Sequence, residues 1–290
     1  MQASVTLSPN NPVYRRRLLV HKLGIFFSTL TMAAGIFFLL WILMILFAKG
    51  FSAINLAMFV ESTPAPGSEG GGLANAIVGS LLMVTFGTLI STPIGILAGI
   101  YLAEYGDRSW FGQLTRFVTD IMLSAPSVVI GLFVYAIYVA HVKHFSGWAG
   151  SLAISLIAIP IVVRNTDNML ALVPASLREA AFALGAPRWK VALIVRLRAV
   201  KAGVLTGVLL AVARISGETA PLLFTALNNQ FFSANMNQPM ANLPIVIYQF
   251  AMSPYDNWRN LAWGGALLVT FSVLLLNILS RTLFKQQKQH

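Results

Sequence analysis

Six long apolar segments limit what this chain can fold into. As a helix, each is long enough to cross the hydrocarbon core of a bilayer, which takes about 20 apolar residues. The expected spans are 23–47, 73–103, 117–140, 149–172, 199–227 and 261–284. Only 10% of the 290 residues are charged, whereas a soluble domain carries about 25%. The sequence therefore predicts an all-α polytopic membrane protein with six transmembrane helices.

The first apolar segment is expected to remain in the mature protein. A secretory signal peptide has an apolar part of about 7–15 residues followed by a small-residue cleavage site. Segment 23–47 is longer and has no convincing site of that kind. It is expected to follow a tail at 1–22 and to lead into an outer loop at 48–72. The remaining spans form a core at 73–284, and 285–290 form a second tail.

Lysine and arginine are distributed unevenly around these spans. If the N-terminus is cytoplasmic, sixteen of them lie in cytoplasmic segments or at cytoplasmic helix ends. The sixteen are Arg15, Arg16, Arg17, Lys22, Arg108, Arg116, Arg164, Arg178, Arg188, Lys190, Arg196, Arg198, Lys201, Arg281, Lys285 and Lys288. Lys49, Lys143 and Arg259 lie on the outer side. This positive-inside bias predicts cytoplasmic N- and C-termini, and it accounts for the net charge of +11 without any nucleic acid.

The inner loop between the fourth and fifth spans predicts a short, separately capped helix within 176–185. Ser176 and Glu179 have the spacing of a capping box. Gly185 is placed to be the left-handed residue after the helix, and Pro187 prevents its continuation. An isolated helix this short is marginal in water. Docking on a partner protein is therefore favoured over a solvated connector.

The residues of this loop carry a family resemblance. Glu179-Ala180-Ala181, followed by Gly185 and Val195-Arg196-Leu197, resembles the EAA loop of ABC importer permeases. In that family the helix docks on the ATP-binding subunit. The resemblance implies an ATPase-coupling role for Glu179, Ala180, Ala181 and Gly185. The family pattern usually ends with a proline where this chain has Arg198.

Four further segments resemble the permease subunits of bacterial phosphate ABC importers. They are Gly71-Gly72-Leu73-Ala74-Asn75, Gly99-Ile100-Tyr101-Leu102-Ala103-Glu104-Tyr105, Leu123-Ser124-Ala125-Pro126-Ser127 and Gly217-Glu218-Thr219-Ala220-Pro221-Leu222-Leu223-Phe224-Thr225. The likeness extends over almost the whole chain from the first span onward. It implies a type I ABC importer permease fold in the bacterial inner membrane. It also implies a sister permease, two ATP-binding subunits and a periplasmic phosphate-binding protein as partners.

Two acid–base pairs fall inside the predicted spans. Arg214 and Glu218 are four residues apart, and Arg164 and Asp167 are three apart, so each pair shares a helix face. An arginine at the bilayer centre costs about 2.5–3.5 kcal/mol on insertion scales and normally faces a partner or a wet cavity. Its planar guanidinium also suits phosphate oxygens. These four residues are predicted to line the substrate path. The alternative is that they only hold helices together, with the second pair snorkelling to the inner interface.

Proline and glycine mark two special backbone positions inside the spans. Pro221 lacks the N–H that would bond the carbonyl of Gly217, and its ring crowds that carbonyl. A kink or hinge is therefore predicted between them, beside Glu218. Gly95 and Gly99 form a GxxxG motif that permits close helix contact.

The chain lacks the motifs of an enzyme. It has no Walker loop for ATP, so energy must come from a partner or a gradient. It has no cysteine, and His141 and His144 alone do not make a metal site; no cofactor is expected. The prediction is a phosphate permease driven by a separate ATPase. Alternatives are a permease for sulfate, molybdate or phosphonate, a gradient-driven transporter, and a passive channel or receptor.

Overall fold

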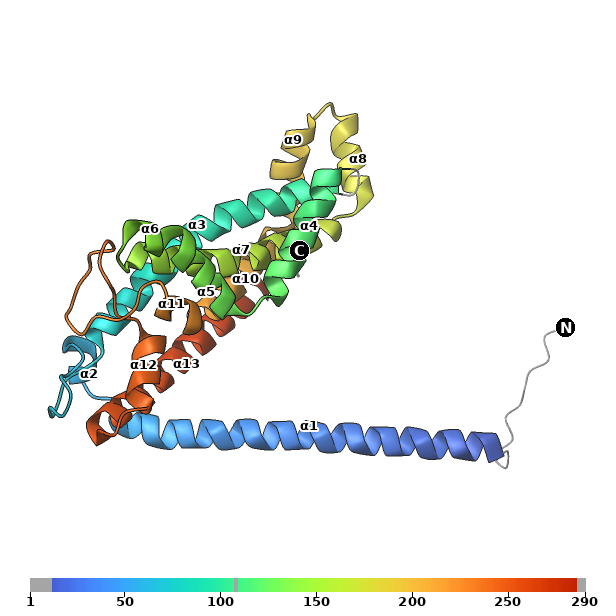
Figure 1. Ribbon diagram of the computed structural model, residues 1–290. Coiled ribbons are helices and arrows are strands. Elements are labelled where there is room, and N and C mark those ends of the chain that lie inside the picture. Colours follow the sequence, from blue (N-terminus) through green and yellow to red (C-terminus); the bar gives the residue numbers. More distant parts are fainter. Residues whose placement is uncertain (1–11, 107–108, 286–290) are drawn as a thin grey trace. The chain divides into compact units, whose positions relative to one another are not determined.

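The computed structural model describes residues 12–106 and 109–285, and this part of the chain is helical without strands (Figure 1). The predicted cytoplasmic cations Arg108 and Lys288 lie outside the described residues. The helices are α1 (Pro12–Ala53), α2 (Ala57–Val60), α3 (Ala74–Tyr105), α4 (Trp110–Ser124), α5 (Ser127–Val134), the π-helix η2 (Tyr135–Val139), α6 (Ala140–Val142), α7 (Gly147–Ala171), α8 (Ala175–Ala183), α9 (Arg188–Lys190), the π-helix η3 (Val191–Arg196), α10 (Leu197–Ile215), α11 (Ala220–Leu223), α12 (Leu243–Ala251) and α13 (Asp256–Lys285).

The chain divides into two units, one ending at Lys49 and the other beginning at Gly50. The first unit consists of most of α1, a continuous helix of apolar side chains that are exposed along most of its length. A helix that is apolar on all sides is typical of a membrane span. In the second unit, α8 and α9 lie at one end and α2 and α12 at the other (Figure 1).

The centre of the second unit is the packing of α3 along α7. A Cβ atom added to Gly95 would stand 2.6 Å from the Val162 side chain, and one added to Gly99 would stand 2.6 Å from Thr166. Such distances leave room only for glycine, which lets the two backbones approach closely. The GxxxG motif is therefore a helix-packing motif here. α10 packs on α7, and α13 packs on α10 and α12.

Four helices of the described chain are long and apolar enough to cross a membrane: α1, α3, α7 and α13. The predicted third span is wrong as a continuous helix, because α4 and the segment from Ser127 to Val142 are bent by 108°. Ala125 lies at the break with extended backbone angles, φ −66 and ψ 136. The cause is Pro126, which disfavours helical angles in the residue before it. If the bent pair counts as one span, there are five candidates.

The predicted fifth span, 199–227, is also interrupted. α10 ends at Ile215, and the chain leaves the helix before the short α11 begins at Ala220. Pro221 stands in the first turn of α11, where its missing N–H costs no hydrogen bond. The predicted kink between Gly217 and Pro221 is therefore a complete helix break.

At the end of the second unit that contains α2 and α12, hydrogen bonds hold two loops together. The Asn75 side chain donates to Thr63 Oγ1 at 3.0 Å and to the carbonyl of Asn229 at 2.9 Å, and it accepts from the Thr63 N–H at 3.1 Å. Asn75 is buried, so a side chain that satisfies these groups is required there. Asn75 thus ties the segment before α3 to the segment after α11.

Candidate functional site

α8 ends as local chemistry requires. α8 is followed by Leu184 and then by Gly185, which has a φ of +78°. The Gly185 N–H donates to the Phe182 carbonyl at 2.9 Å, and the Ala186 N–H donates to the Ala181 carbonyl at 3.1 Å. These two bonds define a Schellman motif, in which glycine takes the left-handed position at little cost. The predicted role of Gly185 in ending the helix is confirmed.

The predicted capping box at the start of α8 is wrong. The N-cap residue is Pro174, with φ −58 and ψ 140, and Ala175 is the first helical residue. Ser176 therefore already lies inside the helix, whereas an N-cap residue needs extended backbone angles. The fixed φ of Pro174 and the strong helix preference of Ala175 start the helix two residues earlier than the predicted N-cap Ser176 requires.

α8 is uncovered although it carries large apolar side chains. All nine of its residues are exposed or half-buried, including Glu179, Ala180 and Ala181. Phe182 is 40% exposed, and Leu184, just past the helix end, is 89% exposed. Exposed apolar side chains grouped in this way are typical of interaction surfaces.

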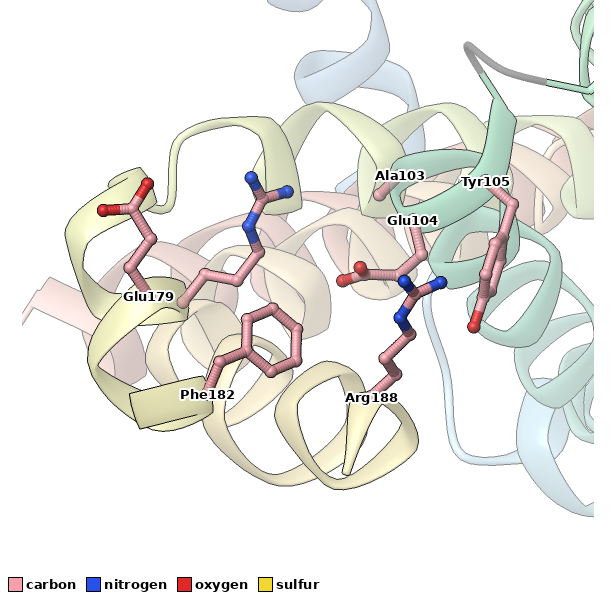
Figure 2. Close-up of a pocket in the computed structure, with 7 residues that line it drawn as sticks. Ala103, Glu104, Tyr105, Glu179, Phe182 and Arg188 are labelled. Carbon is pink, nitrogen blue, oxygen red and sulfur yellow. The ribbon is translucent and has the colours of Figure 1, made fainter. Parts of the chain in front are cut away.

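A cleft of about 360 Å³ separates α8 from the end of α3. Figure 2 shows Glu179 and Phe182 of α8 on one side, Glu104 and Tyr105 of α3 on the other, and Arg188 of α9 between them. Both acidic and basic groups line the cleft, so it has no strong preference for one sign of ligand charge. Within the described residues, no group of three or more His, Asp or Glu side chains could hold a metal ion.

Arg214 and Glu218 lie together where α10 ends. Arg214 Nε stands 3.9 Å from Glu218 Oε1, with the two side chains 57% and 15% exposed. The pair spans the helix terminus rather than one helical face, because α10 stops at Ile215. Arg214 also lines a small cavity with Leu123 and Ser127, which flank the break between α4 and α5.

The two helix breaks of the second unit meet beside Arg214. α11 packs on α5, and a Cβ atom added to Gly131 of α5 would stand 2.6 Å from Pro221 Cα. Pro221 is buried, while Gly217 is exposed in the segment between α10 and α11. Broken helices at membrane depth are tolerated where the freed backbone groups are buried in protein or line a wet cavity.

Arg164 and Asp167 do not form the predicted pair, because each pairs instead with a residue of α4. Arg164 Nη1 lies 3.6 Å from Asp120 Oδ1, and Asp167 Oδ2 lies 3.3 Å from Arg116 Nε. The first pair is exposed, with side chains 44% and 54% accessible, whereas Asp167 is buried. Sequence reasoning missed Asp120 as a partner and placed Arg116 only as a cytoplasmic cation.

A buried ion pair was also missed by the sequence analysis. Arg196 forms an ion pair with Glu104, and their side chains are 8% and 14% exposed. The available signal was the position of Arg196 within an otherwise apolar stretch, Val191 to Leu197.

The fold and these sites can be compared with known proteins. Residues 95–289 match the family of binding-protein-dependent transport system inner membrane components. The chain belongs to this family. A member of this family is a permease component and not an enzyme, as the sequence predicted.

Individual relatives agree with that assignment over nearly the whole chain. The chain is 60% identical over 280 residues to the phosphate transport system permease protein PstA of Pasteurella multocida (strain Pm70), covering 97% of this chain and 100% of the relative. It is 57% identical over 268 residues to the protein of the same name from Yersinia pestis, covering 92% and 91%. The predicted resemblance to phosphate permeases is confirmed.

A solved structure shares the fold. A chain of the MetNI methionine ABC transporter, in its inward facing CY5 native crystal form, aligns with a TM-score of 0.58 and 17% identity. The alignment covers 74% of this chain and 94% of that chain. The family member described here therefore has the predicted helical permease fold.

Proposed function

We propose that this family member is the permease subunit of an ATP-driven importer that carries inorganic phosphate across the inner membrane. The observation that supports this most is its 57–60% identity to phosphate transport system permeases over more than nine-tenths of its length. The termini lie in the cytoplasm under this proposal, and loop 48–72 lies in the periplasm. A sister permease, two ATP-binding subunits and a periplasmic phosphate-binding protein complete the importer.

In this proposal α8 docks on the ATP-binding subunit. Its exposed apolar side chains Phe182 and Leu184 suit insertion of a helix into an apolar groove of a partner. Glu179, Ala180 and Ala181 belong to the same surface, and the Schellman motif at Gly185 fixes where the helix ends. ATP hydrolysis in the partner then moves this helix.

Arg214 and Glu218 are proposed to lie on the phosphate path. The more exposed Arg214 side chain can turn its guanidinium to a phosphate and bind two of its oxygens. Glu218 competes for the same cation, so the anion is not held too tightly to leave. Discontinuous helices such as those meeting beside Arg214 are typical of transporter substrate sites.

We assign different roles to the two predicted path residues of α7. Arg164 and its partner Asp120 are both exposed and are proposed as a second position on the path. Asp167 is buried against Arg116, which favours a role in holding α4 to α7. Gly217 and Pro221 are proposed to let the segment beside Glu218 change its backbone as the path opens.

The proposal is tested with the complete importer in vesicles loaded with ATP, with the phosphate-binding protein outside. Uptake of labelled phosphate is expected to require internal ATP, to proceed without an ion gradient and to persist in excess sulfate or molybdate. Uptake that follows an imposed gradient without ATP would indicate a gradient-driven transporter. Preferential uptake of sulfate, molybdate or a phosphonate would assign a different oxyanion.

A further inference from the structure

One guanidinium joins three helix ends beneath α8. Arg196 is the last residue of η3, immediately before α10, and it forms an ion pair with Glu104 in the last turn of α3. Arg196 Nη2 also donates to the carbonyl of Leu170, in the last turn of α7, at 2.8 Å. The ends of α3 and α7 and the start of α10 are therefore held by a single side chain.

This link is shielded from water. The Arg196 and Glu104 side chains are 8% and 14% exposed, whereas in the Arg214–Glu218 pair the arginine is 57% exposed. Ile100, Leu170 and Ala192 form a buried apolar cluster on the same three elements. A charge in such surroundings is costly unless it is paired and hydrogen-bonded. Separating the two groups would leave a buried charge without its partner, so the ion pair resists being pulled apart.

The π-helical segment places Arg196 in this position. η3 runs from Val191 to Arg196 and replaces a regular α-helical turn between α9 and α10. The wider turn changes the angular position of every residue after it, and such segments are frequent at functional sites. Val191 and Ala192 are buried with Arg196, so the segment turns its cation inward.

The same link borders α8. α8 packs on η3, and Glu104 lines the cleft whose opposite wall is Glu179 and Phe182 (Figure 2). A displacement of α8 therefore acts first on η3 and on the buried pair.

We propose that Arg196 is a positioning residue, which passes movement of α8 to α3 and α7 through its ion pair with Glu104 and its bond to Leu170. This inference rests on the proposed function, in which α8 docks on the ATP-binding subunit. The close packing at Gly99 and Thr166 makes α3 and α7 move together. α7 carries Arg164, so the movement reaches a residue of the proposed path.

The test compares two readouts on the same vesicles that contain the complete importer: ATP hydrolysed and phosphate taken up. In Arg196→Gln and Glu104→Gln the ATP-binding subunit is expected to co-purify and to hydrolyse ATP. Phosphate moved per ATP is expected to fall about ten-fold, the scale at which a member of a coupling network acts. The double variant Arg196→Glu/Glu104→Arg, which restores opposite charges, is expected to regain part of that ratio. Arg259→Gln, which removes the exposed pair with Asp256, is the matched control and keeps the ratio.

Two results would overturn this inference. One is an unchanged ratio of phosphate to ATP in both single variants. The other is a loss of assembled importer in proportion to uptake, with the ratio preserved, because that pattern belongs to a merely structural pair. Failure of the unaltered chain to retain the ATP-binding subunit would instead contradict the proposed function, so the two failures are distinguishable.

Discussion

Asp167 of α7 accepts from Arg116 of α4, with Asp167 Oδ2 3.3 Å from Arg116 Nε. Arg116 also reaches the carbonyl of Leu102 in α3 at 3.4 Å. The carboxylate that sequence spacing placed on the substrate path thus fastens α4 to α7 and, through Arg116, to α3. Its burial favours the packing role that we propose for Asp167, because a path residue needs access to the substrate.

Replacing Asp167 with Asn is expected to lower stability without altering transport per folded molecule. Removing one partner of a buried pair leaves the other uncompensated, which costs about 3–5 kcal/mol when both are fully buried; less is expected here because the Arg116 side chain is 31% exposed. Thermal unfolding in detergent and uptake normalised to folded protein measure the two effects. If the variant loses transport but keeps normal stability, Asp167 lies on the substrate path.

Arg214→Gln is expected to reduce phosphate uptake about ten- to hundred-fold at normal protein level. A hydrogen bond to a charged group contributes about 1.5–3 kcal/mol, and each 1.4 kcal/mol corresponds to about a ten-fold effect. Radioactive phosphate uptake in cells, with membrane content checked by immunoblot, is the measurement. Arg259→Gln serves as the control for loss of one exposed arginine. Undiminished uptake would show that Arg214 does not contribute to the phosphate path.

Gly99→Val is expected to destabilise the second unit, because its first added atom would stand 2.6 Å from Thr166 Cβ and 2.9 Å from the Val163 carbonyl. Overpacking of this kind costs about 1–3 kcal/mol, and here backbone must move. The yield and Tm of purified protein should fall. Leu97→Ala is the control and should change Tm much less, because Leu97 lies on the same helix and is 61% exposed. A Gly99→Val protein with normal Tm would show that α3 and α7 are not closely packed there.

Local chemistry made parts of this fold readable from the sequence. Gly185 ends α8 because only the left-handed region satisfies the last carbonyls there, and that requirement is visible in one residue. Pro126 carried an equally local signal, but the apolar composition continues on both sides of it and suggested one span. Length and hydropathy identify where apolar helix lies, and proline decides whether it is continuous.

The ion pairs that join different helices could not be predicted from the sequence in the same way. Arg164 and Asp167 share a helix face, as do Arg116 and Asp120, but the observed pairs cross from α7 to α4. Spacing reveals which residues share a face and not which other helix that face meets. Arg196 and Glu104, which are 92 residues apart, are hidden for the same reason.

The central claim is that α8 joins the permease to its ATP-binding subunit, and the double variant Glu179→Ala/Gly185→Asp tests it most directly. Both changes lie in the α8 hairpin and away from the proposed path. Phosphate uptake and co-purification of the ATP-binding subunit are measured together, with membrane content of this chain as the reference. The account predicts that uptake fails and the ATP-binding subunit is lost while the chain stays in the membrane. Continued uptake with the ATP-binding subunit still bound would contradict it.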